Sequence, residues 1–255
     1  MPGTLSETAF ERTFASVTSH ATNSAQPRRV RDWFRKLITF WTLIAVVSAG
    51  ALAVFADVGE DVAEQSTTQF DNAVRAWFVA HQNAVLHNIA LAITRIGSPV
   101  VMIVLAIGAG LWFYTRGGRR MAGVVVAAPA VGTLLSRTIK VLYGRARPVG
   151  AELFHETSYS FPSGHASTSA AVVVTLCYVF AREGMISWRT AILVGGIVPL
   201  LVGLTRLYLD VHWTTDVIGG WAVGLFVAAL SAALYERLRK SAPPGVNSVK
   251  PPLVP

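Results

Sequence analysis

Three short clusters of polar residues in this chain combine side chains that bind a phosphate with side chains that can cleave it. The clusters are Lys140 with Arg147, then Ser163-Gly164-His165, and finally Arg206 with His212 and Asp216. Each cluster stands at the end of an apolar run, where a charged residue in a membrane is costly unless it pairs or has a function. This placement favours a phosphate-handling site at a membrane boundary.

The first cluster is suited to holding the phosphate. Lys140 and Arg147 are seven residues apart, and Gly144 and Pro148 predict that the helix ends near Tyr143, so that the arginine can fold back toward the lysine. Arginine can hold two phosphate oxygens with its planar guanidinium, and lysine adds a compact positive charge. The simpler alternative is that these basic residues only mark the edge of a span.

The second cluster reads as a turn that starts a helix. Ser163 can cap that helix, and Gly164 lets the backbone approach a ligand closely. The start of a helix presents free N–H groups to an anion, and His165 would lie beside that anion. Alone the tripeptide is a weak signal, and a serine beside a histidine also suggests a serine nucleophile. The neighbouring basic residues favour a phosphate ester over an acyl substrate.

The third cluster has the spacing of a histidine that is oriented by a carboxylate. His212 and Asp216 are four residues apart and therefore share one face of a helix. An aspartate bonded to one ring nitrogen fixes the tautomer and leaves the other nitrogen as a nucleophile or base. We interpret Asp210 as a surface or capping residue. A histidine that merely lies at the membrane interface is the alternative for His212.

A metal site formed by His165, His212 and Asp216 is a second interpretation of the same residues. The chain has no cysteine pair and no His-Glu-x-x-His run, and the neighbouring lysine and arginines would repel a cation. We therefore expect neither a metal nor another cofactor.

The elements that must position these clusters are membrane helices. Hydrophobic residues make up 53% of the chain and charged residues 14%, whereas soluble domains carry about 25% charged residues. We predict an all-α polytopic membrane protein with six spans, at about 37–56, 100–115, 121–143, 166–181, 190–207 and 214–235. Several runs are shorter than the ~20 residues of a perpendicular span, so their ends are expected to extend into polar flanks. Residues 28–240 form one domain, between a disordered tail at 1–27 and a disordered Pro-rich tail at 241–255.

Positive residues predict the orientation of the spans. Lys and Arg gather before the first run, between the second and third, between the fourth and fifth, and after the sixth. With six spans all four groups fall on one side, which the positive-inside rule makes cytoplasmic. Both termini are then cytoplasmic, and the three clusters lie at the outer face of a plasma membrane of bacterial type. The net charge of +8 is thereby explained without a nucleic-acid partner.

Residues 70–96 have apolar side chains at helical spacing with polar ones between them. This pattern predicts one or two amphipathic helices at the outer interface rather than a seventh span. Such a segment can cap the pocket or guide a lipid into it. His81 and His87 lie on different faces, and we interpret them as interfacial or solvated histidines.

The combined pattern is Lys140–x6–Arg147-Pro148, Pro162-Ser163-Gly164-His165 and Arg206–x5–His212–x3–Asp216. In residue type, order and spacing it resembles the type 2 phosphatidic acid phosphatase (PAP2) family of integral membrane lipid phosphatases, which shares its phosphate pocket with vanadium haloperoxidases. The resemblance covers about residues 37–236. Thr205 stands where a serine often precedes the third-cluster arginine, and it keeps the hydroxyl.

The resemblance implies a role for each cluster residue. His212 would attack phosphorus and form a phosphohistidine that water hydrolyses, Asp216 would orient it, and His165 would protonate the leaving oxygen. The residues that would bind the phosphate oxygens are Lys140, Arg147, Ser163, Gly164 and Arg206. The implied substrates are a polyprenyl diphosphate such as undecaprenyl diphosphate, phosphatidic acid or phosphatidylglycerol phosphate, and no metal would be required.

Two other functions stay open. A lipid phosphotransferase would use the same chemistry with an acceptor other than water. A non-catalytic lipid-binding or transport protein would also have six spans, but it needs neither a nucleophile nor an acid. The spans exclude a soluble haloperoxidase. The sequence does not indicate the lipid tail or the oligomeric state.

Overall fold

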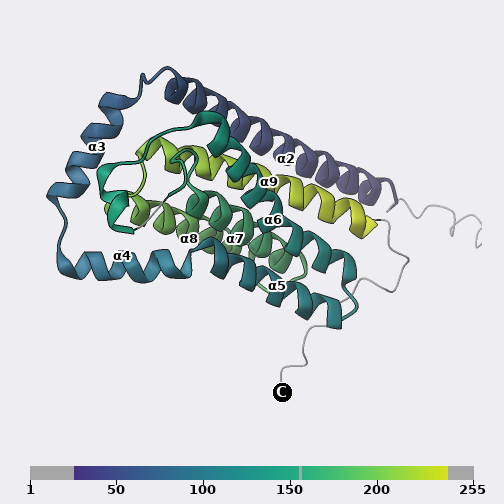
Figure 1. Cartoon of the computed structure of the whole chain (residues 1–255). Coiled ribbons are helices and arrows are strands. Elements are labelled where there is room, and N and C mark those ends of the chain that lie inside the picture. The colour runs from purple at the N-terminus through teal and green to yellow at the C-terminus, as the bar shows by residue number, and fades with distance from the viewer. Residues whose placement is uncertain (1–25, 155–156, 241–255) are drawn as a thin grey trace, which may run out of the picture. The chain divides into compact units, whose positions relative to one another are not determined.

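The structure, a computed structural model, describes residues 26–154 and 157–240 (Figure 1). Its elements are α2 (Gln26–Ala63), α3 (Thr68–Ala80), α4 (Ala84–Ile96), α5 (Pro99–Thr115), α6 (Arg119–Tyr143), the 3-10 helix η1 (Val149–Phe154), α7 (Gly164–Arg182), α8 (Trp188–Tyr208) and α9 (Thr214–Lys240). The described residues contain no strand, so the all-α prediction is confirmed. The predicted tails lie outside the described residues, except that α2 begins at Gln26.

The chain divides into two compact units, Met1–Leu43 and Ile44–Pro255. The described part of the first unit is the N-terminal portion of α2. Apart from α2, whose sequence runs through both units, every element discussed below belongs to the second unit.

Five helices of the described chain are long and apolar enough to cross a membrane: Ile38–Ala63, Arg119–Tyr143, Gly164–Arg182, Trp188–Tyr208 and Thr214–Arg239. Helix α5, which covers the predicted run 100–115, passes the same test only jointly with α4, to which it is joined at a bend of 43°. The six predicted spans therefore correspond to five single helices and this bent pair. Several of these helices extend beyond the predicted runs, as expected for runs shorter than a membrane is thick.

The bend between α4 and α5 has a local cause. Ser98 is extended and its hydroxyl accepts a hydrogen bond from the N–H of Val101 at 3.4 Å, while Pro99 occupies the first helical position. A capping serine followed by proline starts a new helix rather than continuing the previous one. The predicted interfacial segment 70–96 thus becomes two helices, α3 and α4, and the second leads directly into α5.

Helix α7 is the central helix of this unit and packs against α5, α6, α8 and α9. Glycines let α9 approach it closely, because a Cβ added at Gly224 would lie 2.5 Å from both the Cβ of Ala170 and the carbonyl oxygen of Ser167. Small residues at such contacts are typical of helices that pack within membranes. The starts of the two helices are also joined, since the N–H of Ser163 donates to the carbonyl of Asp216 at 2.8 Å.

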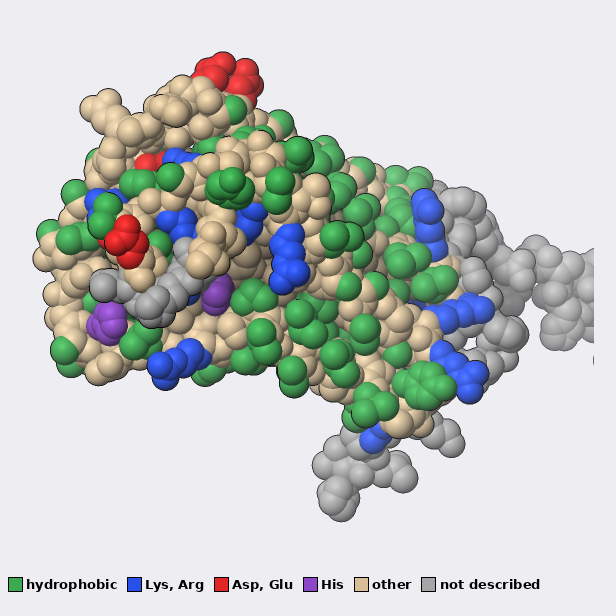
Figure 2. Space-filling view, viewed as in Figure 1, with side chains coloured by type: hydrophobic (Ala, Val, Ile, Leu, Met, Phe, Trp, Pro, Cys, Tyr) green, Lys and Arg blue, Asp and Glu red, His purple; other side chains and the backbone are tan. Residues whose placement is uncertain are grey.

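The outward faces of the spans are apolar. Large hydrophobic side chains such as Leu142, Val141 and Ile192 are each more than 70% exposed, and Figure 2 shows hydrophobic side chains along the visible sides of the helices. Exposed apolar area on this scale is suited to contact with lipid. The chain is an integral membrane protein, and its polar clusters lie where the spans end.

Candidate active site

The three sequence clusters meet at one cavity of about 250 Å³. The cluster residues among its lining are Lys140, Arg147, Gly164, His165 and His212. They come from the end of α6, the loop after it, the start of α7 and the loop between α8 and α9. Residues that are more than 70 positions apart in the chain are thereby gathered around one small space.

Three cluster residues, Arg206, Ser163 and Asp216, do not line the cavity. Arg206 is 3% exposed, and its Nη1 donates to the hydroxyl of Thr94 on α4 at 3.0 Å. Ser163 is buried, and its hydroxyl caps α7 by accepting from the N–H of Ala166 at 3.5 Å. The first residues of α7, with their free N–H groups, therefore form part of the wall, which is a favourable arrangement for an anion.

The basic pair of the first cluster is brought together by the end of α6. The helix ends at Tyr143, as predicted, because Gly144 adopts the left-handed conformation (φ 58°) and donates to the carbonyl of Lys140 at 3.0 Å. The chain then turns back, and Arg147 donates through Nε to the carbonyl of Ser158 at 2.7 Å and through Nη1 to that of Val211 at 2.9 Å.

The side chain of Lys140 lies at the same wall of the cavity. It is 8% exposed, and its ammonium group donates to the carbonyls of Tyr159 and, at 3.1 Å, Ser160. Both cations of the first cluster thus have fixed positions on the cavity surface, so little ordering remains to be done when an anion binds.

His212 and Asp216 are in contact, as their spacing predicted, but His212 lies in the loop before α9 and does not share a helical face with Asp216. The Nδ1 of His212 lies 3.2 Å from Oδ2 of Asp216, and the exposed fractions of the two side chains are 2% and 0%. The same carboxylate oxygen accepts from the N–H of Trp213 at 2.8 Å and from the hydroxyl of Ser160. On the other side of the ring, Nε2 lies 3.2 Å from Nη1 of Arg147.

These contacts assign a tautomer to His212. A guanidinium only donates, so Nε2 carries the lone pair and Nδ1 carries the proton that faces Asp216. Burial, together with the positive charges of Arg147 and Lys140, holds the pKa of His212 well below its usual value. The ring is therefore neutral at pH 7, with its unprotonated nitrogen turned to the cavity, which is the form that a nucleophile or base requires.

His165 faces the same cavity from the first turn of α7. It is half-buried, and no hydrogen bond joins its ring to another described residue. A histidine whose ring is not held by the protein can exchange a proton with a bound molecule.

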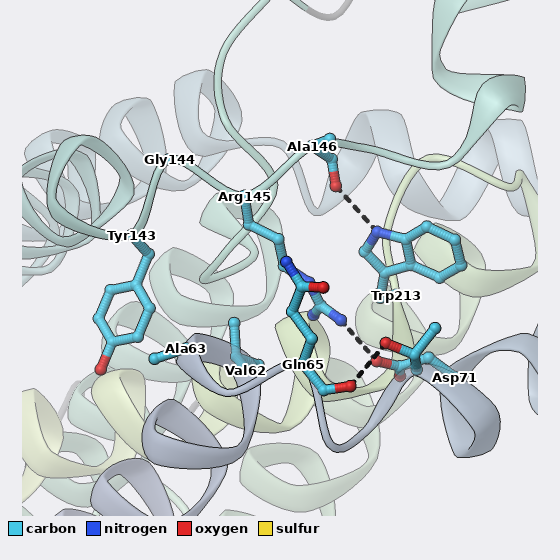
Figure 3. Close-up of a pocket in the computed structure, with 10 residues that line it drawn as sticks. Val62, Ala63, Gln65, Asp71, Tyr143, Gly144, Arg145, Ala146 and Trp213 are labelled. Atoms are coloured by element: carbon cyan, nitrogen blue, oxygen red, sulfur yellow. Dashed lines mark hydrogen bonds and ion pairs between the residues drawn. The ribbon is translucent and has the colours of Figure 1, made fainter.

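Three residues of this site were not predicted from the sequence: Asp71, Arg145 and Ser160. Arg145 donates to Oδ1 of Asp216 and to Oδ2 of Asp71, both at 2.7 Å. Figure 3 shows it beside Trp213 and Asp71 in a second cavity of about 430 Å³. Arg145 does not line the catalytic cavity, and it supports the His212–Asp216 pair from the far side.

One signal for Asp71 was present in the sequence. It shares a helical face with Val74 and Phe78, the apolar face of α3, and an acidic residue on an apolar face needs a buried partner. It is 1% exposed and also accepts from the N–H of Thr215 at 3.0 Å. The partner, Arg145, lies 74 positions away, which no local pattern can reveal.

The interpretation of Asp210 as a surface or capping residue was wrong. It is 8% exposed, and its carboxylate accepts two hydrogen bonds from Arg75 of α3, at 2.6 and 2.7 Å. This bidentate contact raises the pKa of Arg75. Helix α3 is therefore attached to the loop that carries His212. By contrast His81, predicted to be interfacial or solvated, is exposed and stacks on Trp77.

Within residues 26–154 and 157–240, no group of three His, Cys, Asp or Glu residues has the arrangement of a metal site. Two of the three residues considered as ligands, His212 and Asp216, bond to each other instead. The arrangement as a whole presents cations, a helix start and a neutral histidine to one cavity, and it is suited to phosphoryl transfer.

Comparison with known proteins leads to the same chemistry. Residues 121–240 match the PAP2 superfamily. Phosphatidylglycerophosphatase B of Bacillus subtilis is 30% identical over 67% of this chain and 85% of its own length. Undecaprenyl-diphosphatase of Sulfolobus acidocaldarius is 29% identical over 60% of this chain and 73% of its own. The crystal structure of a transmembrane PAP2-type phosphatidylglycerolphosphate phosphatase from Bacillus subtilis superposes with a TM-score of 0.69 and 25% identity, covering 76% of this chain and 98% of that one.

Proposed function

The chain belongs to the PAP2 superfamily and is a membrane lipid phosphatase, and we propose that it hydrolyses a lipid phosphate or diphosphate through a phosphohistidine intermediate. The observation that carries the proposal is the orientation of His212, whose Nδ1 faces Asp216 while Nε2 faces Arg147 and the cavity. A histidine held in this way has one unprotonated ring nitrogen, Nε2, which lies beside the cation that would bind a phosphate.

In the first step the lone pair of His212 Nε2 attacks phosphorus and forms a P–N bond. The P–O bond to the leaving group breaks, its electron pair passes to the leaving oxygen, and His165 supplies the proton to that oxygen. The imidazole ring becomes positive, and the carboxylate of Asp216 stabilises that charge through Nδ1. In the second step His165 accepts a proton from water, the water oxygen attacks phosphorus, and the P–N bond breaks.

The cations would act on the phosphate itself. Lys140 and Arg147 would bind its oxygens from one wall, the first N–H groups of α7 at Gly164 from another, and Arg206 would add positive charge from behind. Ser163 would act by holding the start of α7 in place. Donors fixed before the reaction stabilise a transition state most effectively, and the loss of one typically costs about 10²–10³ in rate.

The substrates that we propose are a polyprenyl diphosphate, such as undecaprenyl diphosphate, and phosphatidic acid or phosphatidylglycerol phosphate. The names of the two relatives support this range, because one is a phosphatidylglycerophosphatase and the other an undecaprenyl-diphosphatase. The test is phosphate release from each lipid by the purified protein in detergent with EDTA present. Added lipid acceptors distinguish hydrolysis from phosphotransfer.

His212→Ala is the decisive variant. We expect it to abolish phosphate release and the acid-labile labelled protein that forms from a phosphate-labelled substrate. His81→Ala is the matched control, because His81 is an exposed histidine that does not line the cavity, and it should retain wild-type activity. Full activity in His212→Ala, or labelling that survives this substitution, would show that the nucleophile is another group.

We further propose that both termini are cytoplasmic and that the cavity opens at the outer face. The distribution of Lys and Arg between the spans supports this orientation. The chain contains a single cysteine, Cys177, which is buried, so introduced cysteines can be labelled selectively. A membrane-impermeant maleimide should modify His81→Cys in intact cells and Arg119→Cys only after permeabilisation. The reverse pattern would invert the orientation.

A further inference from the structure

The catalytic cavity continues beyond Lys140 along one face of α6. The residues of this helix that line it are Thr133, Ser136, Arg137 and Lys140. They are spaced at i, i+3, i+4 and i+7 and therefore lie on the same side of the helix. Because each residue adds about 1.5 Å, Thr133 lies roughly 10 Å from Lys140 along the span. The cavity thus has a polar wall that leads from the catalytic residues toward the middle of the membrane.

Arg137 is the unexpected member of this wall. It is exposed, and it lies within the span Arg119–Tyr143, six residues before its end. No hydrogen bond or ion pair joins its guanidinium to another residue in the described part of the chain. An arginine in a span is costly and is a functional candidate by default, with a partner to be identified. None of the described residues that line the cavity is acidic, so that partner is not a carboxylate of the same wall.

The hydroxyls beside Arg137 are a second, independent observation. Ser136 is 1% exposed, and its Oγ has no hydrogen-bond partner among the described residues; the same holds for Oγ1 of Thr133. The Oγ of Ser136 lies 3.9 Å from the position that a Cβ would take on Gly164, so it faces the start of α7. Buried polar groups in proteins nearly always have partners, and these two line a cavity that an anionic head group would enter.

We propose that Arg137, with Ser136 and Thr133, forms a second anion subsite that binds the lipid-linked phosphate of a lipid diphosphate. The inference rests on the proposed function, because it places the terminal phosphate at His212. The lipid tail has to return to the bilayer, and the wall that leads there from the catalytic residues carries Arg137. The phosphate next to the tail would therefore meet this guanidinium.

The chemistry of the leaving group explains why this subsite would favour diphosphates. When Nε2 of His212 bonds to the terminal phosphorus, the bridging P–O bond breaks and its electron pair stays on the lipid monophosphate. His165 supplies a proton to the bridging oxygen, and the released lipid monophosphate still carries the negative charge of its own phosphate, which an adjacent guanidinium binds. The diacylglycerol that leaves from phosphatidic acid is protonated in the same way but contains no phosphate, so it offers no anion that a second cation could bind.

The test compares two substrates in Arg137→Gln. We expect the ratio of kcat/KM for undecaprenyl diphosphate to kcat/KM for phosphatidic acid to fall roughly 10- to 150-fold, the range for one charge-assisted hydrogen bond. Arg137→Lys keeps the charge and should recover most of the ratio, whereas Ser136→Ala should lower it about two- to tenfold. Arg119→Gln, at the opposite end of the same helix, is the matched control and should leave the ratio unchanged.

Binding of inorganic ions provides a measurement that does not depend on turnover. Pyrophosphate should raise the unfolding temperature of the wild-type protein more than orthophosphate does, and Arg137→Gln should remove that difference. An unchanged substrate ratio together with an unchanged pyrophosphate effect would overturn the subsite. So would a wild-type protein that cleaves phosphatidic acid but not the diphosphate. Absence of phosphate release from any lipid, with the pyrophosphate effect intact, would instead refute the proposed function and leave the subsite standing.

Discussion

Replacing Arg145 by glutamine should slow catalysis although Arg145 does not line the catalytic cavity. Its guanidinium donates to Oδ1 of Asp216 at 2.7 Å, and the other carboxylate oxygen of Asp216 faces His212. The exposed fraction of the Arg145 side chain is 16% and that of Asp216 is 0%, so water competes little for this contact. Arg145 is thus a positioning residue that acts on the nucleophile through the aspartate.

The size of the effect follows from the bond that is lost. A hydrogen bond to a charged group contributes about 1.5–3 kcal/mol, and each 1.36 kcal/mol corresponds to a tenfold change in rate. We therefore expect kcat to fall roughly 10- to 150-fold, with little change in KM, because the residues that would bind the phosphate remain. Loss of one partner from a buried ion pair destabilises a fold by about 3–5 kcal/mol. For Arg145→Gln we expect the lower end of this range of destabilisation, because Ser160 and Trp213 still donate hydrogen bonds to Asp216.

The assay must separate slower chemistry from loss of folded protein. We would measure kcat and KM by phosphate release and the unfolding temperature in the same detergent. Arg182→Gln is the matched control, because it breaks the ion pair with Glu236 at the opposite end of α7. It should lower the unfolding temperature and leave kcat within about twofold.

A pH profile tests the positioning role directly. The charge of Arg145 helps to keep the pKa of His212 low, so the acid limb of kcat/KM should move to higher pH in Arg145→Gln. A residue that only stabilised the fold would not move this limb. An unchanged kcat in Arg145→Gln would refute the reasoning. So would a loss of kcat in Arg182→Gln that is as large as the loss in Arg145→Gln.

Two further predictions concern stability. The pKa of His212 is lower in the folded protein than in the unfolded chain, so below about pH 6.5 the unfolded state takes up a proton that the folded state does not. The unfolding temperature of the wild type should therefore fall more steeply between pH 7 and pH 5 than that of His212→Asn. An equal fall in unfolding temperature in the two proteins would contradict this. Gly224→Ala should destabilise the protein by about 1–3 kcal/mol, because the new Cβ would meet α7 at 2.5 Å. Gly123→Ala is its control, since nothing lies within 4 Å of the added atom, and equal unfolding temperatures for the two variants would show that α9 can move away from α7.

The spans and the placement of the motifs could be predicted because both depend on local features of the sequence. An apolar run long enough to cross a bilayer must form a helix, as its backbone groups have no other partners there. The end of α6 at Tyr143 followed from Gly144. The His212–Asp216 contact was expected from their spacing, although His212 lies in the loop before α9 and not on the helix itself. In each case the residues that determine the structure lie within one or two turns of one another.

The remainder of the site could not be predicted because its partners are distant in sequence. Asp71 and Arg145 are 74 positions apart, and Arg75 and Asp210 are 135 apart. The amphipathic pattern of 70–96 predicted an apolar face but not what that face would contact. The contact between Thr94 of α4 and Arg206 of α8 joins residues that are 112 positions apart, and it could not be predicted for the same reason.

Four of the cations near the cavity fall into two pairs, and the difference between the pairs explains how one small space can hold a nucleophile, a carboxylate and an anionic substrate. Arg75 and Arg145 bond carboxylates, and these ion pairs attach α3 to the polypeptide around His212. Lys140 and Arg147 instead donate to backbone carbonyls and line the cavity. Because Asp216 contacts His212 from the side opposite the cavity, it can stabilise a positive ring without repelling a phosphate. The cations on the cavity side contribute twice, since they help to keep His212 unprotonated before the substrate arrives and would then bind the phosphate that the ring attacks.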